Sequence, residues 1–333
     1  MIFFIDILSV LAISAVFILI ARKFHFSEVI GLIAAGVFLS ILPLKDVFLR
    51  SDREYLEVLS SVGLYTLMFL SGFEVSWSML AKQRKNSVIL TLSTMVVSLI
   101  LGFVVLRLLG FSTAASLIMG ICFGITAEAT KAKVLIELKK IKSKLGSLLI
   151  DSGIINDIIG VLALVFISYF FANNFSLNEV WNLVGIIFSF LLGIMAHIFF
   201  DRHNFKMKML EKILFYTIVP FFFVNIGLNF NIFDFVFDYK LFIFIFLASA
   251  SGQILGVLLI KKLINIDLKQ AWLVGWGMNS KGAVELAIAY VAYRAGIIPS
   301  SLYSILVAVA LISTIIFQII IFKMVRKNPR VMN

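Results

Sequence analysis

Cysteine, histidine and charged residues are all scarce in this sequence. Its one cysteine, Cys122, lies in an apolar run, so the chain offers neither a disulfide framework nor a thiolate metal site. The three histidines are scattered near charged loops, which indicates structural or surface roles; they are His25, His197 and His203. The sequence shows no nucleotide motif, metal cluster or nucleophile–base pair. We therefore expect neither an enzyme nor a bound cofactor.

Apolar residues dominate what is present. Only 14% of the residues are charged, 62% are hydrophobic, and the mean hydropathy is +1.09. A soluble domain is usually about 45–50% apolar. Apolar runs of about 20 residues recur along the whole chain, which predicts an all-α polytopic protein of the cell membrane. The first run has its basic residues after it, so we expect a retained helix rather than a signal peptide.

The apolar runs predict about eleven transmembrane helices. Charged residues or Gly, Pro and Asn separate them. The expected spans are residues 2–21, 27–43, 55–73, 87–109, 113–136, 146–171, 179–200, 212–229, 241–260, 270–293 and 301–322.

The distribution of Lys and Arg predicts the orientation of these spans. With the N-terminus outside and the C-terminus inside, 22 basic residues, Lys131 among them, are assigned to inside loops and 6 to outside loops. The remaining one of the 29, Lys281, falls within a span. The net charge of +11 is therefore expected to face the cytoplasm and its anionic lipids, and no nucleic-acid partner is expected.

Four ionisable residues lie well inside the predicted spans: Glu128, Asp157, Lys281 and Glu285. A charge at mid-bilayer costs about 2.5–3.5 kcal/mol, so such residues are expected to face a cavity or a partner. Asp157 is the deepest, about 16 Å from the inner end of its span. Asp151 is shallower and is interpreted as an inner-funnel or packing residue.

A carboxyl group at the depth of Asp157 has two competing ligands. Burial favours the protonated acid, whereas an approaching cation favours the carboxylate. Proton and cation then alternate at one site, which is the chemistry of an exchanger. The alternative is a neutral acid that is hydrogen-bonded to a neighbouring helix.

Two spans combine glycines with a polar centre. They contain "GICFGITAEATKAK" (120–133) and "GWGMNSKGAVELAIAY" (275–290). Each is the central span of three, and the two sets of three run in opposite directions, which predicts inverted repeats with two crossed broken helices. Thr126 and Thr130, one turn apart, are expected to bond freed backbone groups. Close helix packing is the alternative explanation of the glycines.

Five segments, in this order, resemble the monovalent cation:proton antiporter superfamily, in particular the branch with bacterial potassium-efflux and Na⁺/H⁺ antiporters and plant cation/H⁺ exchangers. The resemblance extends over about residues 10–320. The segments are "LMFLSGFEVS" (67–76), "ITAEATKAKVLIELKKIKSKLG" (125–146), "IINDIIGVL" (154–162), "PFFFVNIGLNFNI" (220–232) and "GMNSKGAVELAIA" (277–289).

The resemblance implies a division of the chain and an ion site. A core bundle would comprise approximately residues 55–171 and 241–322, and a scaffold or dimerisation part approximately residues 1–43 and 179–229, in a homodimer with elevator-like alternating access. Asp157 would bind Na⁺ or K⁺ or H⁺. Asn156, Thr126 and Thr130 would shape the site, with Glu74 and Asp151 as cytoplasmic-side candidates.

Three departures from the family pattern modify these expectations. The chain is shorter by about two helices in the scaffold part. Asn156 and Gln253 stand where electrogenic relatives carry a charged pair, which favours electroneutral exchange. Glu128 stands where a neutral residue is usual, and Lys281 takes an arginine position. We expect Lys281 to be neutralised by Glu128 across the broken helices or by Glu285 one turn along its own helix.

The predicted function is antiport of Na⁺ or K⁺ against H⁺. A cation or proton channel would need a continuous pore with repeated acidic or carbonyl rings. Two more functions stay open for this sequence: a sodium-coupled organic-anion symporter of the same architecture, and a structural role without transport. The sequence does not predict which cation is carried.

Overall fold

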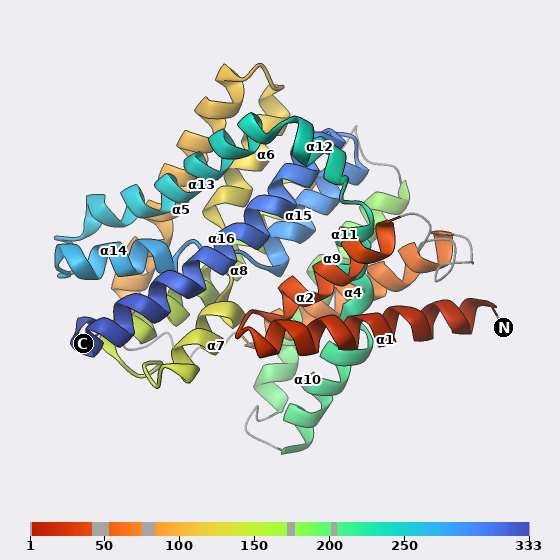
Figure 1. Ribbon diagram of the computed structural model, residues 1–333, viewed down its shortest axis with the longest axis horizontal. Helices are drawn as coiled ribbons and strands as arrows, with labels where there is room; N and C mark the ends of the chain where they lie inside the picture. The colour runs from red at the N-terminus through yellow and green to blue at the C-terminus, as the bar shows by residue number, and fades with distance from the viewer. Residues whose placement is uncertain (1, 42–52, 75–83, 172–176, 201–204, 333) are drawn as a thin grey trace. The chain divides into compact units, whose positions relative to one another are not determined.

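The computed structural model describes residues 2–41, 53–74, 84–171, 177–200 and 205–332 (Figure 1). Within these ranges the regular secondary structure is helical. Contacts divide the chain into two compact units, each made of two segments. Unit 1 comprises Met1–Ser76 and Ser176–Phe230, and unit 2 comprises Trp77–Phe175 and Asn231–Asn333.

Unit 1 consists of six helices in its described ranges: α1 (Ile2–Lys23), α2 (Glu28–Ser40), α4 (Arg53–Glu74), α9 (Leu177–Phe199), α10 (Phe205–Thr217) and α11 (Val219–Leu228). Helix α11 packs against α2 and α4, and α4 packs along α9. An apolar cluster on α1, α2, α4 and α11 forms part of the core; it contains Val10, Ala35, Leu39, Leu56, Phe221 and Val224.

Glycines bring α4 and α9 into backbone contact. A Cβ atom on Gly72 would collide with the carbonyl oxygen of Phe190, and one on Gly193 with that of Phe69. Without these two side chains the helices approach closely, and packing contacts of this kind hold membrane helices together in lipid.

Unit 2 contains the longer helices and both predicted breaks. Its elements in the described ranges are α5 (Arg84–Leu108), α6 (Thr113–Gly124), α7 (Glu128–Glu137), α8 (Lys144–Phe170), α12 (Ile232–Phe237), α13 (Tyr239–Ile260), α14 (Leu268–Gly277), α15 (Ala283–Arg294), α16 (Ser300–Lys327) and the 3₁₀ helix η3 (Pro329–Met332). Helix α5 packs against α6, α8 and α13, and α16 packs against α13, α14 and α15.

Side-chain caps fix the starts of α6, α8 and α14, among other helices of unit 2. The Ser112 hydroxyl accepts from the Ala115 N–H at 3.1 Å to start α6, and Ser143 does the same for α8. At the start of α14, Asp267 accepts from the Gln270 N–H at 2.7 Å while the Gln270 side chain accepts from the Asp267 N–H at 3.1 Å. These bonds satisfy backbone donors that a helix start leaves unpaired.

The all-helical prediction is confirmed, and each predicted span overlaps a helix or a pair of helices. In the described part of the chain, nine segments are long and apolar enough to cross a membrane. Helix α2 is shorter, and the segment of α14 and α15 is divided by its break. The exact count and the orientation stay predictions, and the predicted breaks after residues 43, 73, 171 and 200 fall wholly or partly outside the described residues.

A third division was not predicted. The span expected at 212–229 is two helices, α10 and α11, which are separated at Ile218. Pro220 lies in the first turn of α11. Because proline lacks an N–H and its ring clashes with the carbonyl group four residues earlier, α10 cannot continue through Pro220.

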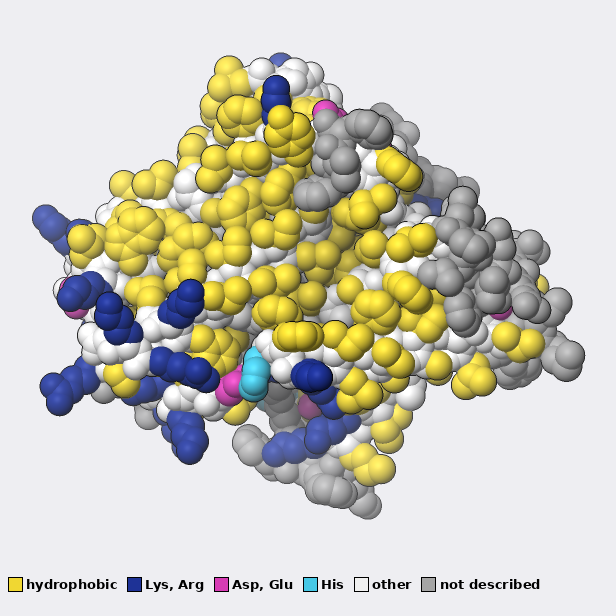
Figure 2. Space-filling view, viewed as in Figure 1, with side chains coloured by type: hydrophobic (Ala, Val, Ile, Leu, Met, Phe, Trp, Pro, Cys, Tyr) yellow, Lys and Arg dark blue, Asp and Glu magenta, His cyan; other side chains and the backbone are white. Residues whose placement is uncertain are grey.

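The surface of unit 2 is apolar along its helices and basic at one end. Exposed apolar residues recur every four positions on α5: Leu92, Val96, Ile100 and Val104. Figure 2 shows hydrophobic side chains along α13 and α16, and Lys and Arg side chains near the end of α16. At this end, the Lys144 ammonium donates to the Asn265 carbonyl at 2.9 Å. The pattern agrees with lipid-facing helices and a basic inner end.

The division of the chain into two units differs in one helix from the predicted division into core and scaffold. Residues 55–73 were assigned to the core bundle, but α4 belongs to unit 1, where it packs against α9 and α11. The assignment of transport and dimerisation to particular parts of the chain stays a prediction.

Candidate functional site

The two breaks in unit 2 lie against each other. Helix α6 ends at Gly124 and α7 begins at Glu128, while α14 ends at Gly277 and α15 begins at Ala283. Between them the Ala127 N–H donates to the Ser280 carbonyl at 2.9 Å, and the Ser280 hydroxyl donates to the Ala127 carbonyl at 3.2 Å. Peptide groups released by one break are thus satisfied by the other, as buried backbone requires.

A glycine permits this close crossing. A Cβ atom on Gly282 would lie 2.5 Å from the Cβ of Ala127. Real Cβ atoms do not approach that closely, so the residue at 282 has to lack a side chain for the two unwound segments to meet.

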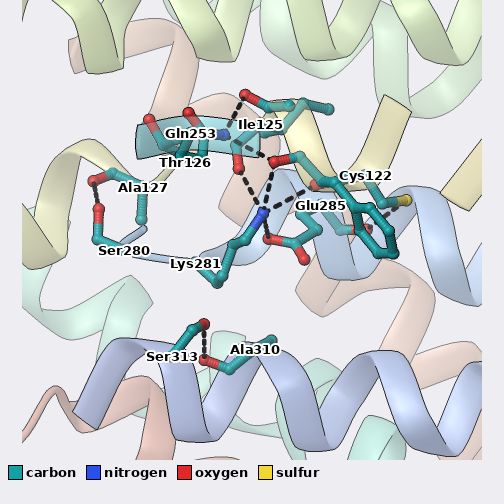
Figure 3. A network of polar contacts seen from close by, with 12 residues as sticks. Cys122, Ile125, Thr126, Ala127, Gln253, Ser280, Lys281, Glu285, Ala310 and Ser313 are labelled. Carbon is teal, nitrogen blue, oxygen red and sulfur yellow. Dashed lines mark hydrogen bonds and ion pairs between the residues drawn. The ribbon is translucent and has the colours of Figure 1, made fainter. Parts of the chain in front are cut away.

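The Lys281 ammonium is inserted at the C-terminal end of α6 (Figure 3). It donates to the carbonyl oxygens of Phe123 at 2.8 Å, Cys122 at 3.2 Å and Ile125 at 3.3 Å. A cation here offsets the negative end of the helix dipole and satisfies carbonyls that the helix end leaves unpaired. Lys281 therefore joins the second break to the end of the first broken helix.

Lys281 is paired with Glu285, the second of its two predicted partners. Its ammonium lies 3.8 Å from Oε2 of Glu285, and both side chains are fully buried. Glu285 lies in the first turn of α15, where the positive end of the helix dipole favours a carboxylate. Both charges are thus placed at helix ends that favour them.

Gln253 completes the cap on α6 from helix α13. Its amide nitrogen donates to the Phe123 carbonyl at 2.7 Å and to the Gly124 carbonyl at 3.1 Å (Figure 3). Gln253, which stands where some relatives carry a charge, thus has a structural contact of its own. It donates to carbonyl groups at the same helix end as Lys281.

Asn156 and Thr126 meet between α8 and the first break. The Asn156 amide nitrogen donates to the Thr126 hydroxyl at 3.0 Å, and both residues are fully buried. The carbonyl oxygen of Asn156 has no hydrogen-bond partner in the part of the chain that the structure describes. Asp157 follows on α8 and is 9% exposed. Amide and hydroxyl oxygens thus meet beside the break, and Asp157 is the next residue along α8.

The expected role of the two threonines needs correction. Thr126 lies in the unwound segment and Thr130 lies in α7, so they do not share one helix turn. The Thr126 hydroxyl contacts the side chains of Asn156 and Lys131 rather than freed backbone groups. Thr130 is buried near the start of α7.

Lys131 is a buried charge near the breaks that sequence reasoning missed. It was assigned to an inside loop, but it lies in α7 with 0% of its surface exposed, and its ammonium donates to the Thr126 hydroxyl at 2.7 Å. The carboxylates of Asp157 and Glu128 are near enough to act on its charge. A signal was present, since Lys131 falls within the span predicted at 113–136, three residues after Glu128.

The remaining predicted carboxylates are placed differently. Glu128 is the first residue of α7 and is buried, and Gly153 on α8 allows its close approach. Asp151 is also on α8, 3% exposed, and its Oδ2 atom has no hydrogen-bond partner among the described residues. Glu74 ends α4 and therefore belongs to unit 1, whereas the other site residues belong to unit 2.

Curated relatives of this chain include several named antiporters. A Na⁺/H⁺ antiporter of Enterococcus hirae is 23% identical over 357 residues, which cover 91% of this chain and 92% of the relative. The Na⁺/H⁺-K⁺ antiporter GerN of Bacillus cereus is 23% identical, with 87% of each chain covered. Cation/H⁺ antiporter 17 of Arabidopsis thaliana is 21% identical over 92% of this chain and 46% of its own length.

A solved structure has the same fold. The sodium proton antiporter MjNhaP1 from Methanocaldococcus jannaschii superimposes with a TM-score of 0.69 over 98% of each chain, at 14% sequence identity. The family described as "Sodium/hydrogen exchanger, transmembrane" matches residues 9–207 and 175–327. This chain is therefore an integral multi-pass membrane protein that belongs to the sodium/hydrogen exchanger family.

Proposed function

We propose that this protein is a secondary antiporter that exchanges a monovalent cation, Na⁺ or K⁺, for H⁺ at Asp157. The observation that carries the proposal is the position of Asp157 on α8, beside the hydrogen bond between Asn156 and Thr126 at the first break. Family membership and the names of the relatives agree with this chemistry.

Oxygen atoms supply the cation site in this proposal. The Asp157 carboxylate provides the charge, while the unpaired Asn156 oxygen and the hydroxyls of Thr126 and Thr130 provide neutral ligands. Oxygen ligands of this kind replace the hydration shell of an alkali cation. Protonation of Asp157 removes the charge and releases the cation, so the two ligands alternate at one carboxyl group.

Electroneutral exchange is the stoichiometry that we propose. Asn156 adds a ligand without a second charge, and Gln253 caps α6 without contributing a titratable group. One cation then replaces one proton, so the site has the same net charge whether it holds the cation or the proton.

In the proposed alternating-access cycle, the two units have different roles. We assign ion transport to unit 2, which contains both breaks, and the dimer scaffold to unit 1 in a homodimer. Glu74 in unit 1 and Asp151 in unit 2 stay candidates for the cytoplasmic side, and anionic inner-leaflet lipids are proposed to contact the basic end of unit 2.

The test is proton flux in proteoliposomes that contain a pH-sensitive dye. Pulses of Na⁺, K⁺ and Li⁺ are compared in the wild type, in Asp157→Asn and in Glu137→Gln, which changes an exposed carboxylate of α7. We expect flux in the wild type and in Glu137→Gln and none in Asp157→Asn. Unchanged flux in Asp157→Asn would refute the proposed site.

Three further measurements distinguish the proposed antiporter from different modes of transport. A strong effect of an imposed membrane potential on the flux would contradict electroneutrality. Unitary currents in a planar bilayer would indicate a channel. Sodium-driven uptake of an organic acid without proton counterflux would indicate a symporter.

A further inference from the structure

Two buried lysines lie near the breaks, and they are held in different ways. Lys281 has three backbone carbonyls within 3.3 Å and the Glu285 carboxylate at 3.8 Å. Lys131 has one short contact, to the Thr126 hydroxyl at 2.7 Å, with the Leu149 carbonyl at 3.4 Å and the Met278 sulfur at 3.7 Å. Contacts at the last two distances are weak. Lys281 is thus fixed at a helix end, whereas Lys131 is held mainly by one neutral oxygen.

The single short contact of Lys131 is to a proposed cation ligand. The Thr126 hydroxyl also accepts from Asn156, so the ammonium and the amide share one oxygen. The other two contacts come from α8 and from the end of α14. The ammonium therefore lies where both broken helices meet the helix that carries Asp157.

Charged groups of both signs face the Lys131 ammonium. Three charged side chains influence it electrostatically: Asp157 on α8, Glu128 on the same helix α7, and Lys281 at the second break. Two carboxylates thus attract one ammonium. Glu128 precedes Lys131 by three residues on α7, the spacing at which helix side chains can pair.

We propose that Lys131 acts as a tethered cation. Whenever no transported cation is bound, its ammonium stays bonded to the Thr126 hydroxyl and is attracted by the Asp157 carboxylate. An entering Na⁺ or K⁺ displaces the ammonium, which moves towards Glu128. Lys131 is then a positioning residue that sets cation affinity, and this inference rests on the proposed exchange at Asp157.

Competition predicts opposite effects for two variants. Lys131→Met removes the competitor and should lower the half-saturating cation concentration about tenfold if the ammonium holds the site about nine-tenths of the time. Lys131→Arg keeps a permanent charge and should raise that concentration. Lys133→Met is the matched control, because it removes the same charge from a more exposed position on α7.

Glu128→Gln tests the second position of the ammonium. Without the carboxylate the lysine stays on Thr126, so the half-saturating concentration should rise. In Lys131→Met/Glu128→Gln the glutamate change should have no further effect of this kind, since no ammonium remains to be held. This double-mutant cycle isolates the coupling between the two side chains.

Thermal-shift titrations with NaCl and KCl make the inference testable without transport. The same variants are titrated in detergent at constant ionic strength, and the cation concentration that gives half of the stabilisation is measured. If Lys131→Met lowers this concentration while the wild type shows no exchange in proteoliposomes, the inference about Lys131 is supported and the proposed exchange is refuted. If Lys131→Met does not change it, or if Met and Arg shift it in the same direction, Lys131 is structural and the inference is wrong.

Discussion

The Lys281 ammonium lies 2.8 Å from the Phe123 carbonyl and 3.8 Å from the Glu285 carboxylate, so one cation joins the end of α6 to the start of α15. The arrangement places a positive charge at a helix C-terminus and a negative charge at a helix N-terminus. Both are fully buried, so each depends on the other for its neutralisation.

Removal of the lysine should destabilise the protein more than removal of the glutamate charge. Lys281→Met leaves a buried carboxylate and the carbonyls of Cys122 and Ile125 without the ammonium, while the Phe123 carbonyl keeps its bond from Gln253. Loss of one member of a buried pair costs about 3–5 kcal/mol. Glu285→Gln leaves the ammonium with its three carbonyls and should cost less. The measurement is thermal unfolding of the purified protein in detergent.

The double variant Lys281→Met/Glu285→Gln is the control for this pairing. It removes both charges, so its loss of stability should be smaller than the sum of the two single losses. Additive losses would show that the two side chains do not stabilise each other.

Gln253 is predicted to stabilise the protein through its bonds to the end of α6. Gln253→Leu leaves the Phe123 and Gly124 carbonyls without this donor, and buried groups that lose a partner cost about 1–3 kcal/mol. Thermal unfolding measures the loss.

Gln318 on α16 offers a matched control for Gln253. It is also buried, but neither amide atom has a hydrogen-bond partner among the described residues. Gln318→Leu should therefore be neutral or stabilising, since the leucine removes a buried unsatisfied amide. Equal losses from both substitutions would contradict the capping role of Gln253.

The breaks could be predicted from the sequence because their cause is local. Near Gly124 and near Gly282, glycines and polar residues interrupt an apolar run that is otherwise long enough for a continuous membrane helix. The partner of Lys281 could be narrowed to two residues but not to one, because the choice depends on which helix end faces the ammonium. That geometry arises only when the two unwound segments pair through Ala127 and Ser280.

Lys131 shows where sequence reasoning was misled. The charge-counting rule assigns lysines near a helix end to a loop, and the run of basic residues after Lys131 made that assignment natural. Because α7 starts only at Glu128, Lys131 lies near its first turn, where it is fully buried and bonded to Thr126. The division between α10 and α11 was missed for another reason, since Pro220 was taken as part of a motif rather than as a helix start.

Proton competition at Asp157 predicts a pH-dependent cation affinity. Protons and cations share one carboxylate in the proposed cycle, so acid should weaken cation binding. Below the pH at which the carboxyl takes up its proton, each further unit should raise the half-saturating cation concentration about tenfold by mass action. Flux is measured against Na⁺ and K⁺ concentration over a pH series, with equal pH on both sides before each pulse. A half-saturating concentration that does not change with pH would contradict competition.

Gly153 is predicted to set the distance between α8 and α7. A Cβ atom at this position would lie 2.8 Å from the Cβ and 2.9 Å from the Cα of Glu128, so a larger residue has to push the two helices apart. Overpacking of this kind costs about 1–3 kcal/mol of stability. Because the same two helices carry Asn156 and Lys131, Gly153→Val should also raise the half-saturating cation concentration. Ala129→Val is the control, since Ala129 lies on the same helix α7 but is exposed. Stability and flux that match this control would show that the close approach of the two helices is not needed for the site.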